Sequence, residues 1–178
     1  MKTPTVPAQL LKLPPSVGPV PGAFWRPNAL FIRELAAHLR GARVLEVFAG
    51  NGFLAAWLAQ AGVRVQATSR RSGHDAHEAG FYHPVEQIDA ATAVAKHQDQ
   101  SDVLLICWPV VTEDVLKAAR LWGERPIVYI GEVTDYRKGH LGGCASDAFF
   151  EAIEHGHRFE SYRGNPLEMA MVCKLRNA

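Results

Sequence analysis

The chain has 178 residues, of which 48% are hydrophobic and 21% are charged, and its formal net charge is +1. This length fits one domain with a substantial core, and the composition is that of an ordinary globular protein. A nearly neutral total gives no electrostatic case for a nucleic-acid partner, and no apolar run is long enough to predict a membrane span.

The three cysteines form an odd, scattered set without paired spacing, at Cys107, Cys144 and Cys173. Such a set indicates a reduced protein, and it therefore predicts a cytoplasmic location. The oligomeric state has no signature in the sequence.

Most of the prolines lie near the start of the chain, so residues 1–22 are predicted to form an extended arm and residues 23–178 a single domain. Helices are predicted at about 28–39, 52–61, 89–97, 112–122 and 146–155. Strands are predicted at 43–48, 63–68, 85–88, 102–107, 126–130, 158–162 and 168–175. This alternation predicts an α/β fold with a doubly wound, mostly parallel seven-stranded sheet. Helices should cover both faces, and the last two strands should form a C-terminal antiparallel hairpin.

The first predicted strand ends in a turn that is typical of a ligand site in α/β proteins. Gly50 and Gly52 lack a β-carbon, so the backbone there can take positive φ and lie against a ligand. Glu46 is a carboxylate in an otherwise apolar strand, and burial of such a group is costly unless it meets a partner. A cationic or hydroxyl-bearing ligand would be such a partner.

The segment Glu46-Val47-Phe48-Ala49-Gly50-Asn51-Gly52 resembles motif I of the class I S-adenosylmethionine-dependent methyltransferases. The resemblance implies S-adenosyl-L-methionine as cofactor, with its methionine part on this loop and its ammonium group near Glu46. It also implies a methyltransferase-like Rossmann domain over residues 23–178, in which a final antiparallel strand lies beside the fifth strand.

By the same resemblance, cofactor contacts are expected after each of the next strands. In this family an acidic residue usually follows the second strand and binds the ribose, whereas this chain has Ser69 followed by Arg70 and Arg71. Asp89 is expected near the adenine, although its position also suits a helix N-cap. The full set of expected cofactor residues is Glu46, Phe48, Ala49, Gly50, Asn51, Gly52, Thr68, Ser69, Asp89, Ala90, Cys107 and Trp108.

The methyl acceptor is expected near the glycine-rich loop of residues 131–145. Glu132 and His140 are the candidate catalytic residues, because either could accept a proton from the acceptor. After the fourth strand only Pro109 agrees with the Asp/Asn-Pro-Pro-Tyr/Phe motif of nucleic-acid methyltransferases, so base methylation by that route is not supported. A small molecule or an exposed side chain is the expected acceptor.

Two other functions stay open. Gly50, Gly52 and Ala55 also fit a dinucleotide fingerprint, and Arg70 with Arg71 would suit the 2′-phosphate of NADP. A non-catalytic interaction domain of the same fold is the third possibility.

Two further groups have more than one interpretation. One group of residues has side chains of the types that bind metal ions, namely His74, Asp75, His77 and His83. It is interpreted as part of a polar loop, so no metal site is predicted. The aromatic pair Phe24 and Trp25 could cover the cofactor or could anchor the proline-rich arm.

Overall fold

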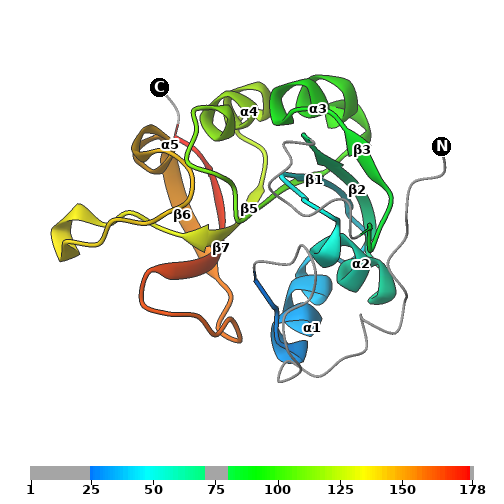
Figure 1. Cartoon of the computed structure of the whole chain (residues 1–178), viewed down its shortest axis with the longest axis horizontal. Coiled ribbons are helices and arrows are strands. Elements are labelled where there is room, and N and C mark those ends of the chain that lie inside the picture. The colour runs from blue at the N-terminus through cyan, green and yellow to red at the C-terminus, as the bar shows by residue number, and fades with distance from the viewer. Residues whose placement is uncertain (1–24, 71–79, 177–178) are drawn as a thin grey trace.

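The computed structural model describes residues 25–70 and 80–176 (Figure 1). The arm predicted for residues 1–22 lies outside the described residues. So do Phe24, Arg71, His74, Asp75 and His77, for which the sequence predictions remain as they stand.

A seven-stranded sheet forms the centre of the fold, in the order β3-β2-β1-β4-β5-β7-β6. The first five strands in this order pair in parallel, whereas β7 is antiparallel to both β5 and β6. The predicted fold class and the antiparallel strand beside the fifth strand are therefore confirmed. The strands are β1 Arg43–Val47, β2 Arg64–Ser69, β3 Val85–Gln87, β4 Val103–Cys107, β5 Ile127–Glu132, β6 Ile153–Arg158 and β7 Glu168–Leu175.

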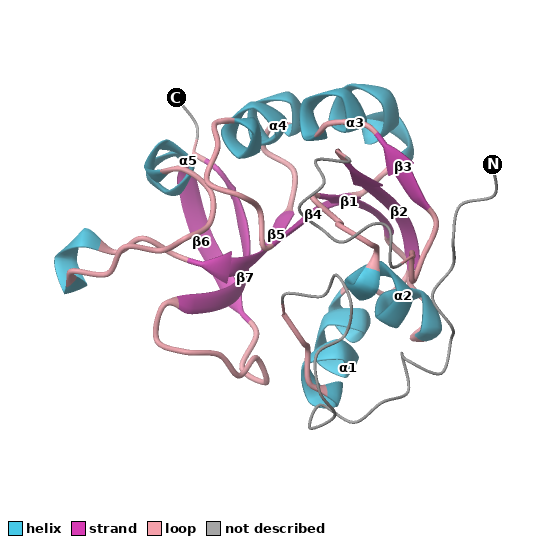
Figure 2. Ribbon diagram, viewed as in Figure 1, coloured by secondary structure: helices cyan, strands magenta, loops and turns pink. Residues whose placement is uncertain are grey.

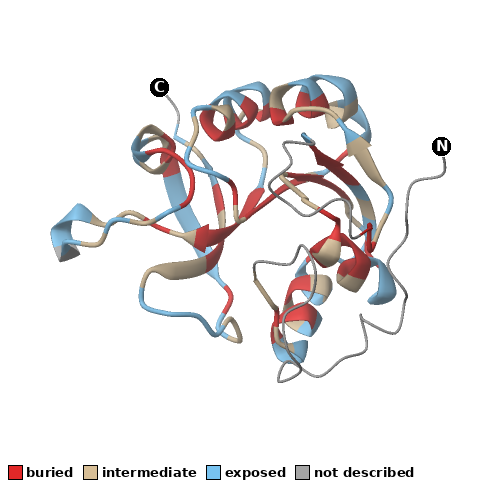
Figure 3. Cartoon of the chain, in the orientation of Figure 1, coloured by how far each residue is buried: buried red, intermediate tan, exposed pale blue. Residues whose placement is uncertain are grey.

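Helices cover both faces of the sheet, as Figures 1 and 2 show. One face packs against α1 (Ala29–His38) and α2 (Phe53–Gln60), and the other against α3 (Ala90–His97), α4 (Asp114–Trp122) and α5 (Asp147–Ala152). Buried residues concentrate along the central strands and on the helix sides that face them (Figure 3). Within the described ranges, none of the helices combines the length and apolar character needed to cross a bilayer.

Side chains satisfy the free N–H groups at the start of several helices. Asn28 accepts a hydrogen bond from the Phe31 N–H at 2.9 Å, and Thr112 Oγ1 accepts one from the Asp114 N–H at 3.1 Å. These contacts explain why the predicted starts of α1 and α4 are close to the observed ones. In contrast, α2 begins after Gly52, which has no side chain to cap it.

The predicted position of the sixth strand was wrong. The helix α5 ends at Ala152, not near His155, and β6 occupies residues 153–158, not 158–162. Ile153 takes an extended conformation and is completely buried, so it ends the helix and starts the strand. Phe159 follows β6, where its backbone N–H still donates to the Ala170 carbonyl of β7 at 3.0 Å, and its ring packs edge-on against Phe31 at a centroid distance of 5.8 Å.

Candidate functional site

The loop after β1 has an unusual backbone conformation. Phe48, Gly50 and Gly52 have φ angles of 60°, 53° and 74°, in the left-handed region. The loop is fixed to the end of β2, because the Ala49 N–H donates to the Thr68 carbonyl at 3.0 Å. Phe48, Ala49 and Gly50 remain partly exposed, which leaves them accessible to a ligand.

Glu46 lies beneath this loop with an exposed fraction of only 1%. Burial raises the pKa of its carboxyl group to about 8, and a hydrogen bond from the Ala55 N–H in the first turn of α2 partly offsets this. The carboxyl group therefore takes the place of the missing side-chain cap of α2, a structural role that the sequence did not indicate. Its second oxygen, Oε2, is buried and has no hydrogen-bond partner among the described residues. One half of this carboxyl group thus lies unpaired in the interior beneath the loop.

Three of the expected cofactor residues support the loop from inside. Asn51 Nδ2 donates to the Gly80 carbonyl at 3.2 Å, and Thr68 Oγ1 donates to the Glu46 carbonyl at 3.0 Å. A β-carbon on Gly52 would lie 2.9 Å from Val85 Cγ2, so close packing as well as positive φ requires glycine there. These contacts describe a scaffold for the loop.

A cavity of about 290 Å³ lies beyond the carboxyl ends of β1, β2 and β4. Five of the expected cofactor residues line it: Phe48, Ser69, Asp89, Ala90 and Trp108. The structure thus brings together residues from four separate parts of the sequence. Ile88, Val110, Thr112 and Asp114 also line the cavity and were not expected there, although Ile88 adjoins Asp89 in sequence and Val110 closely follows Trp108.

Trp108 follows β4 as Phe48 follows β1, and it too has a positive φ, of 48°. Its backbone N–H donates to the Ile130 carbonyl at 2.7 Å, whereas its indole Nε1 is buried and finds no acceptor within residues 25–70 and 80–176. The preceding residue, Cys107, faces the opposite side of the sheet in the cluster with α1 and α2. Burial raises the pKa of the Cys107 thiol well above its usual value, so the thiol stays protonated.

Asp89 acts as the N-cap of α3 while it lines the cavity. Its carboxylate accepts from the Thr92 N–H at 3.0 Å and from Thr92 Oγ1 at 2.8 Å, and these bonds lower the pKa of Asp89. Arg70 lies nearby, with a guanidinium nitrogen 3.9 Å from Asp114 Oδ2. Asp89 and Asp114 thus both lie near the positive charge of Arg70.

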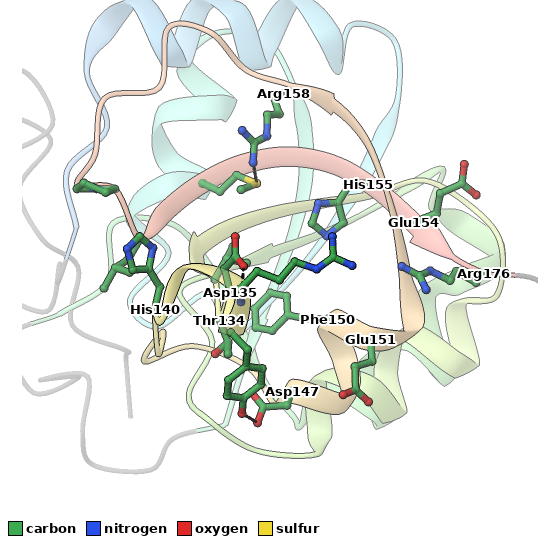
Figure 4. Close-up of a pocket in the computed structure, with 16 residues that line it drawn as sticks. Thr134, Asp135, His140, Asp147, Phe150, Glu151, Glu154, His155, Arg158 and Arg176 are labelled. Atoms are coloured by element: carbon green, nitrogen blue, oxygen red, sulfur yellow. Dashed lines mark hydrogen bonds between the residues drawn. The ribbon is translucent and has the colours of Figure 1, made fainter.

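The two candidate catalytic residues lie apart from this cavity. Glu132 Oε2 accepts the Gly143 N–H at 2.6 Å and so holds the glycine-rich loop to the end of β5. His140 pairs with Asp135 through backbone hydrogen bonds in both directions, which closes a small hairpin around the 3₁₀ turn Tyr136–Lys138. It lines a second cavity of about 700 Å³, between this hairpin, α5 and β6 (Figure 4).

Other side chains of interest have structural contacts. Trp25 packs against Phe31 and Tyr162, each at a centroid distance of 5.9 Å, which is an anchoring contact. His83 Nε2 lies 3.4 Å from the Val65 carbonyl, and burial lowers the pKa of the ring. In the part of the chain that the structure describes, no three His, Cys, Asp or Glu side chains are grouped to hold a metal ion.

The strand order, the antiparallel β7 and the cavity beside a glycine loop together define the fold of the class I S-adenosylmethionine-dependent methyltransferases. Solved structures of this fold are similar to the chain. The mitomycin 7-O-methyltransferase MmcR has a TM-score of 0.54 and 16% identity, over 82% of this chain and 53% of its own. The glycopeptide N-methyltransferase MtfA, in complex with S-adenosyl-L-methionine, has a TM-score of 0.55 and 12% identity, over 86% and 96%.

A ribosomal protein L11 methylase from Lactobacillus delbrueckii subsp. bulgaricus has a TM-score of 0.51 and 12% identity, over 83% of this chain and 77% of its own. The chain thus spans about half the length of MmcR but nearly all of MtfA. No family model matches the sequence, and no curated protein is detectably similar to it. At these identities the likeness is one of fold.

Proposed function

We propose that the chain is an S-adenosylmethionine-dependent methyltransferase that acts on a small molecule or an exposed side chain. The observation that carries this proposal is the 290 Å³ cavity, which lies at the carboxyl ends of β1, β2 and β4 in a methyltransferase fold. MtfA, which shares the fold, has been solved with S-adenosyl-L-methionine and with sinefungin. We place the protein in the cytoplasm, since its three cysteines are free and buried.

The residues of the site fit the chemistry of the cofactor. The unpartnered Oε2 of Glu46 would accept a hydrogen bond from the ammonium group. Phe48 and Trp108 would supply apolar walls to the adenine. Ser69 and Asp89 would hydrogen-bond to polar groups of the nucleoside, and Asp114 supplies the cavity with a carboxylate in a chain that lacks the usual acid after the second strand.

When bound, S-adenosyl-L-methionine supplies an electrophilic methyl group on a good leaving group. The protein therefore has to align the acceptor and exclude water more than it has to activate a bond. We propose that His140, which lines the larger cavity, accepts the proton from the acceptor. Glu132 holds the neighbouring loop in place through Gly143.

An NADP-binding function is not favoured by the surroundings of Arg70. A 2′-phosphate needs a cation free of nearby carboxylates, but a guanidinium nitrogen of Arg70 lies 3.9 Å from Asp114 Oδ2. The charge of Arg70 also acts on Asp89.

Thermal unfolding with S-adenosylhomocysteine, with NADPH and with buffer alone tests the proposal. A ligand at a hundred times its Kd stabilises by about 2.7 kcal/mol, which corresponds to about 5–10 °C for a chain of this size. We expect this shift with S-adenosylhomocysteine alone. A shift with NADPH alone would favour a dinucleotide-binding protein, and no shift with either would favour an interaction domain.

The Glu46→Gln variant should lose most of the S-adenosylhomocysteine shift while it remains folded, because glutamine keeps the size of the side chain. Glu160→Gln is the matched control, since Glu160 is exposed and distant in sequence from the loop. An equal shift in the two variants would remove Glu46 from the site.

A further inference from the structure

The larger cavity, of about 700 Å³, is lined by both acidic and basic side chains (Figure 4). Asp147 and Glu151 lie on the wall formed by α5. His155 and Arg158 come from β6, and Arg176 follows β7. The hairpin after β5 adds Asp135 and Arg137, and Glu154 lies on β6, so acidic and basic groups both come from more than one element.

Most of the acidic groups already have partners. The Asp147 carboxylate accepts a hydrogen bond from the Tyr136 hydroxyl group. Asp135 Oδ1 accepts from the Arg137 backbone N–H at 3.1 Å, and Glu154 Oε2 lies 3.5 Å from Lys174 Nζ. Of these three carboxylates, Glu154 has a cationic partner, and the other two are oriented by neutral donors.

The basic groups lack such partners. Arg176 Nε donates to the Ile153 carbonyl at 2.9 Å, and an Arg158 nitrogen lies 3.2 Å from Met169 Sδ, which is a weak acceptor. Over residues 25–70 and 80–176, no carboxylate comes within 4.0 Å of Arg137, Arg158 or Arg176. Three guanidinium groups thus share one cavity without a direct ion pair to any of the carboxylates that also line it.

Two of these arginines lie close to His155. Partial desolvation lowers the pKa of His155, and the positive charges of Arg158 and Arg176 lower it further. A bound anion would relieve this repulsion, because carboxylate and phosphate oxygens accept strong hydrogen bonds from guanidinium groups.

We propose that this cavity binds the carboxylate or phosphate group of a small molecule through Arg137, Arg158 and Arg176. We infer that this small molecule is the methyl acceptor, and this part of the inference rests on the proposed function. The loop after β5 supports this role, because it contributes His140 to the cavity wall. The acidic wall of α5 favours an acceptor whose other end is neutral or cationic, and it disfavours a polyanion.

Nuclear magnetic resonance of the full chain with isotope-labelled histidine tests the site. The probes are succinate and inorganic phosphate, each added at constant ionic strength against sodium chloride, with His155 assigned from a His155→Gln variant. We expect a saturable change in the His155 signal, and a rise in its pKa, with at least one of the two probes. The probe that binds more tightly tells whether the site takes carboxylates or phosphates.

Arg137→Gln and Arg158→Gln should each weaken probe binding by about tenfold, since each removes hydrogen bonds to a charged group. Arg40→Gln is the matched control, because Arg40 is exposed after α1 and does not line this cavity. The inference would be overturned if succinate and phosphate changed the His155 signal no more than sodium chloride does. It would also be overturned if both cavity variants bound the probe as tightly as the natural chain. Anion binding needs no S-adenosylhomocysteine, so failure of the methyltransferase proposal would be seen separately in the thermal experiment.

Discussion

Phe48 and Trp108 hold the same left-handed backbone conformation at the ends of neighbouring strands. Phe48 follows β1 and Trp108 follows β4, and these two strands pair in parallel. Both side chains line the 290 Å³ cavity. Left-handed φ at a residue other than glycine costs about 1 kcal/mol or more. Two such residues at one cavity indicate that the backbone is shaped for that cavity.

Trp108→Phe and Trp122→Phe form a matched pair of variants. Trp122 Nε1 donates to the Pro126 carbonyl at 3.0 Å, whereas Trp108 Nε1 has no acceptor. Both changes remove a similar volume, but only Trp122→Phe breaks a hydrogen bond. In urea unfolding, we expect Trp122→Phe to lose about 1–2 kcal/mol more of the free energy of unfolding than Trp108→Phe does. Equal losses would mean that the buried Trp108 N–H has a partner.

Gly52→Ala and Gly62→Ala separate steric clash from backbone strain. Both glycines have positive φ, but a β-carbon on Gly52 would lie 2.9 Å from Val85 Cγ2, whereas one on Gly62 would meet nothing within 4 Å. Gly62→Ala should therefore cost only the strain of about 1 kcal/mol. Gly52→Ala should cost about 1–3 kcal/mol more, because the neighbours must move. Denaturant unfolding of the two variants measures the difference, and equal values would contradict this packing.

The buried Glu46 should make stability depend on pH in one direction. Its pKa is raised from 4.5 to about 8 in the folded protein, so between these values the folded state holds a proton that the unfolded state has released. The stabilisation is complete below about pH 4.5, and it is lost as the pH rises to about 8.

Each pKa unit corresponds to about 1.4 kcal/mol, so the rise from 4.5 to about 8 sets an upper limit of about 5 kcal/mol on the effect. Urea unfolding at pH 5 and pH 8 should show the stability of the natural chain falling relative to Glu46→Gln. If the difference in unfolding free energy between the natural chain and Glu46→Gln is the same at pH 5 and at pH 8, Glu46 does not titrate in this range.

Binding of the cofactor product should release a proton from Glu46. An ammonium group beside the carboxyl group favours its charged form, so affinity for S-adenosylhomocysteine should increase from pH 6 to pH 8. Calorimetry in buffers of different ionisation enthalpy should show the release of up to about one proton per site near pH 7. Glu46→Gln should bind with no such release. Proton release that persists in the variant would assign it to another group.

Much of the fold could be predicted, because buried parallel strands and amphipathic helices have distinct patterns of apolar residues. The sixth strand could not be placed, because its outward residues are polar and Phe149, Phe150 and Ile153 continue a helical spacing. What ends α5 is the burial of Ile153 in the sheet, where it pairs with Leu175. That contact depends on the tertiary structure.

The candidate site was predictable where residues lie one or two positions after a strand, as Phe48, Asp89 and Trp108 do. Asp114 was assigned only to the first turn of a helix, and its place in the cavity depends on how α4 packs over the end of β4. Glu46 was recognised as unusual from its apolar neighbours, but its contact with Ala55 required the position of α2.

The irregularity in β6 also has a consequence for how copies of the chain meet. β6 is the last strand of the sheet, and its pairing with β7 shifts register between His155 and Arg158. A β-carbon on Gly156 would lie only 3.0 Å from the Val172 carbonyl, which shows how closely the two backbones approach there. This register shift, flanked by charged side chains, interrupts the regular row of backbone N–H and C=O groups that a strand of another chain would pair with. The edge strand of the sheet is thereby protected against edge-to-edge pairing with other copies of the chain.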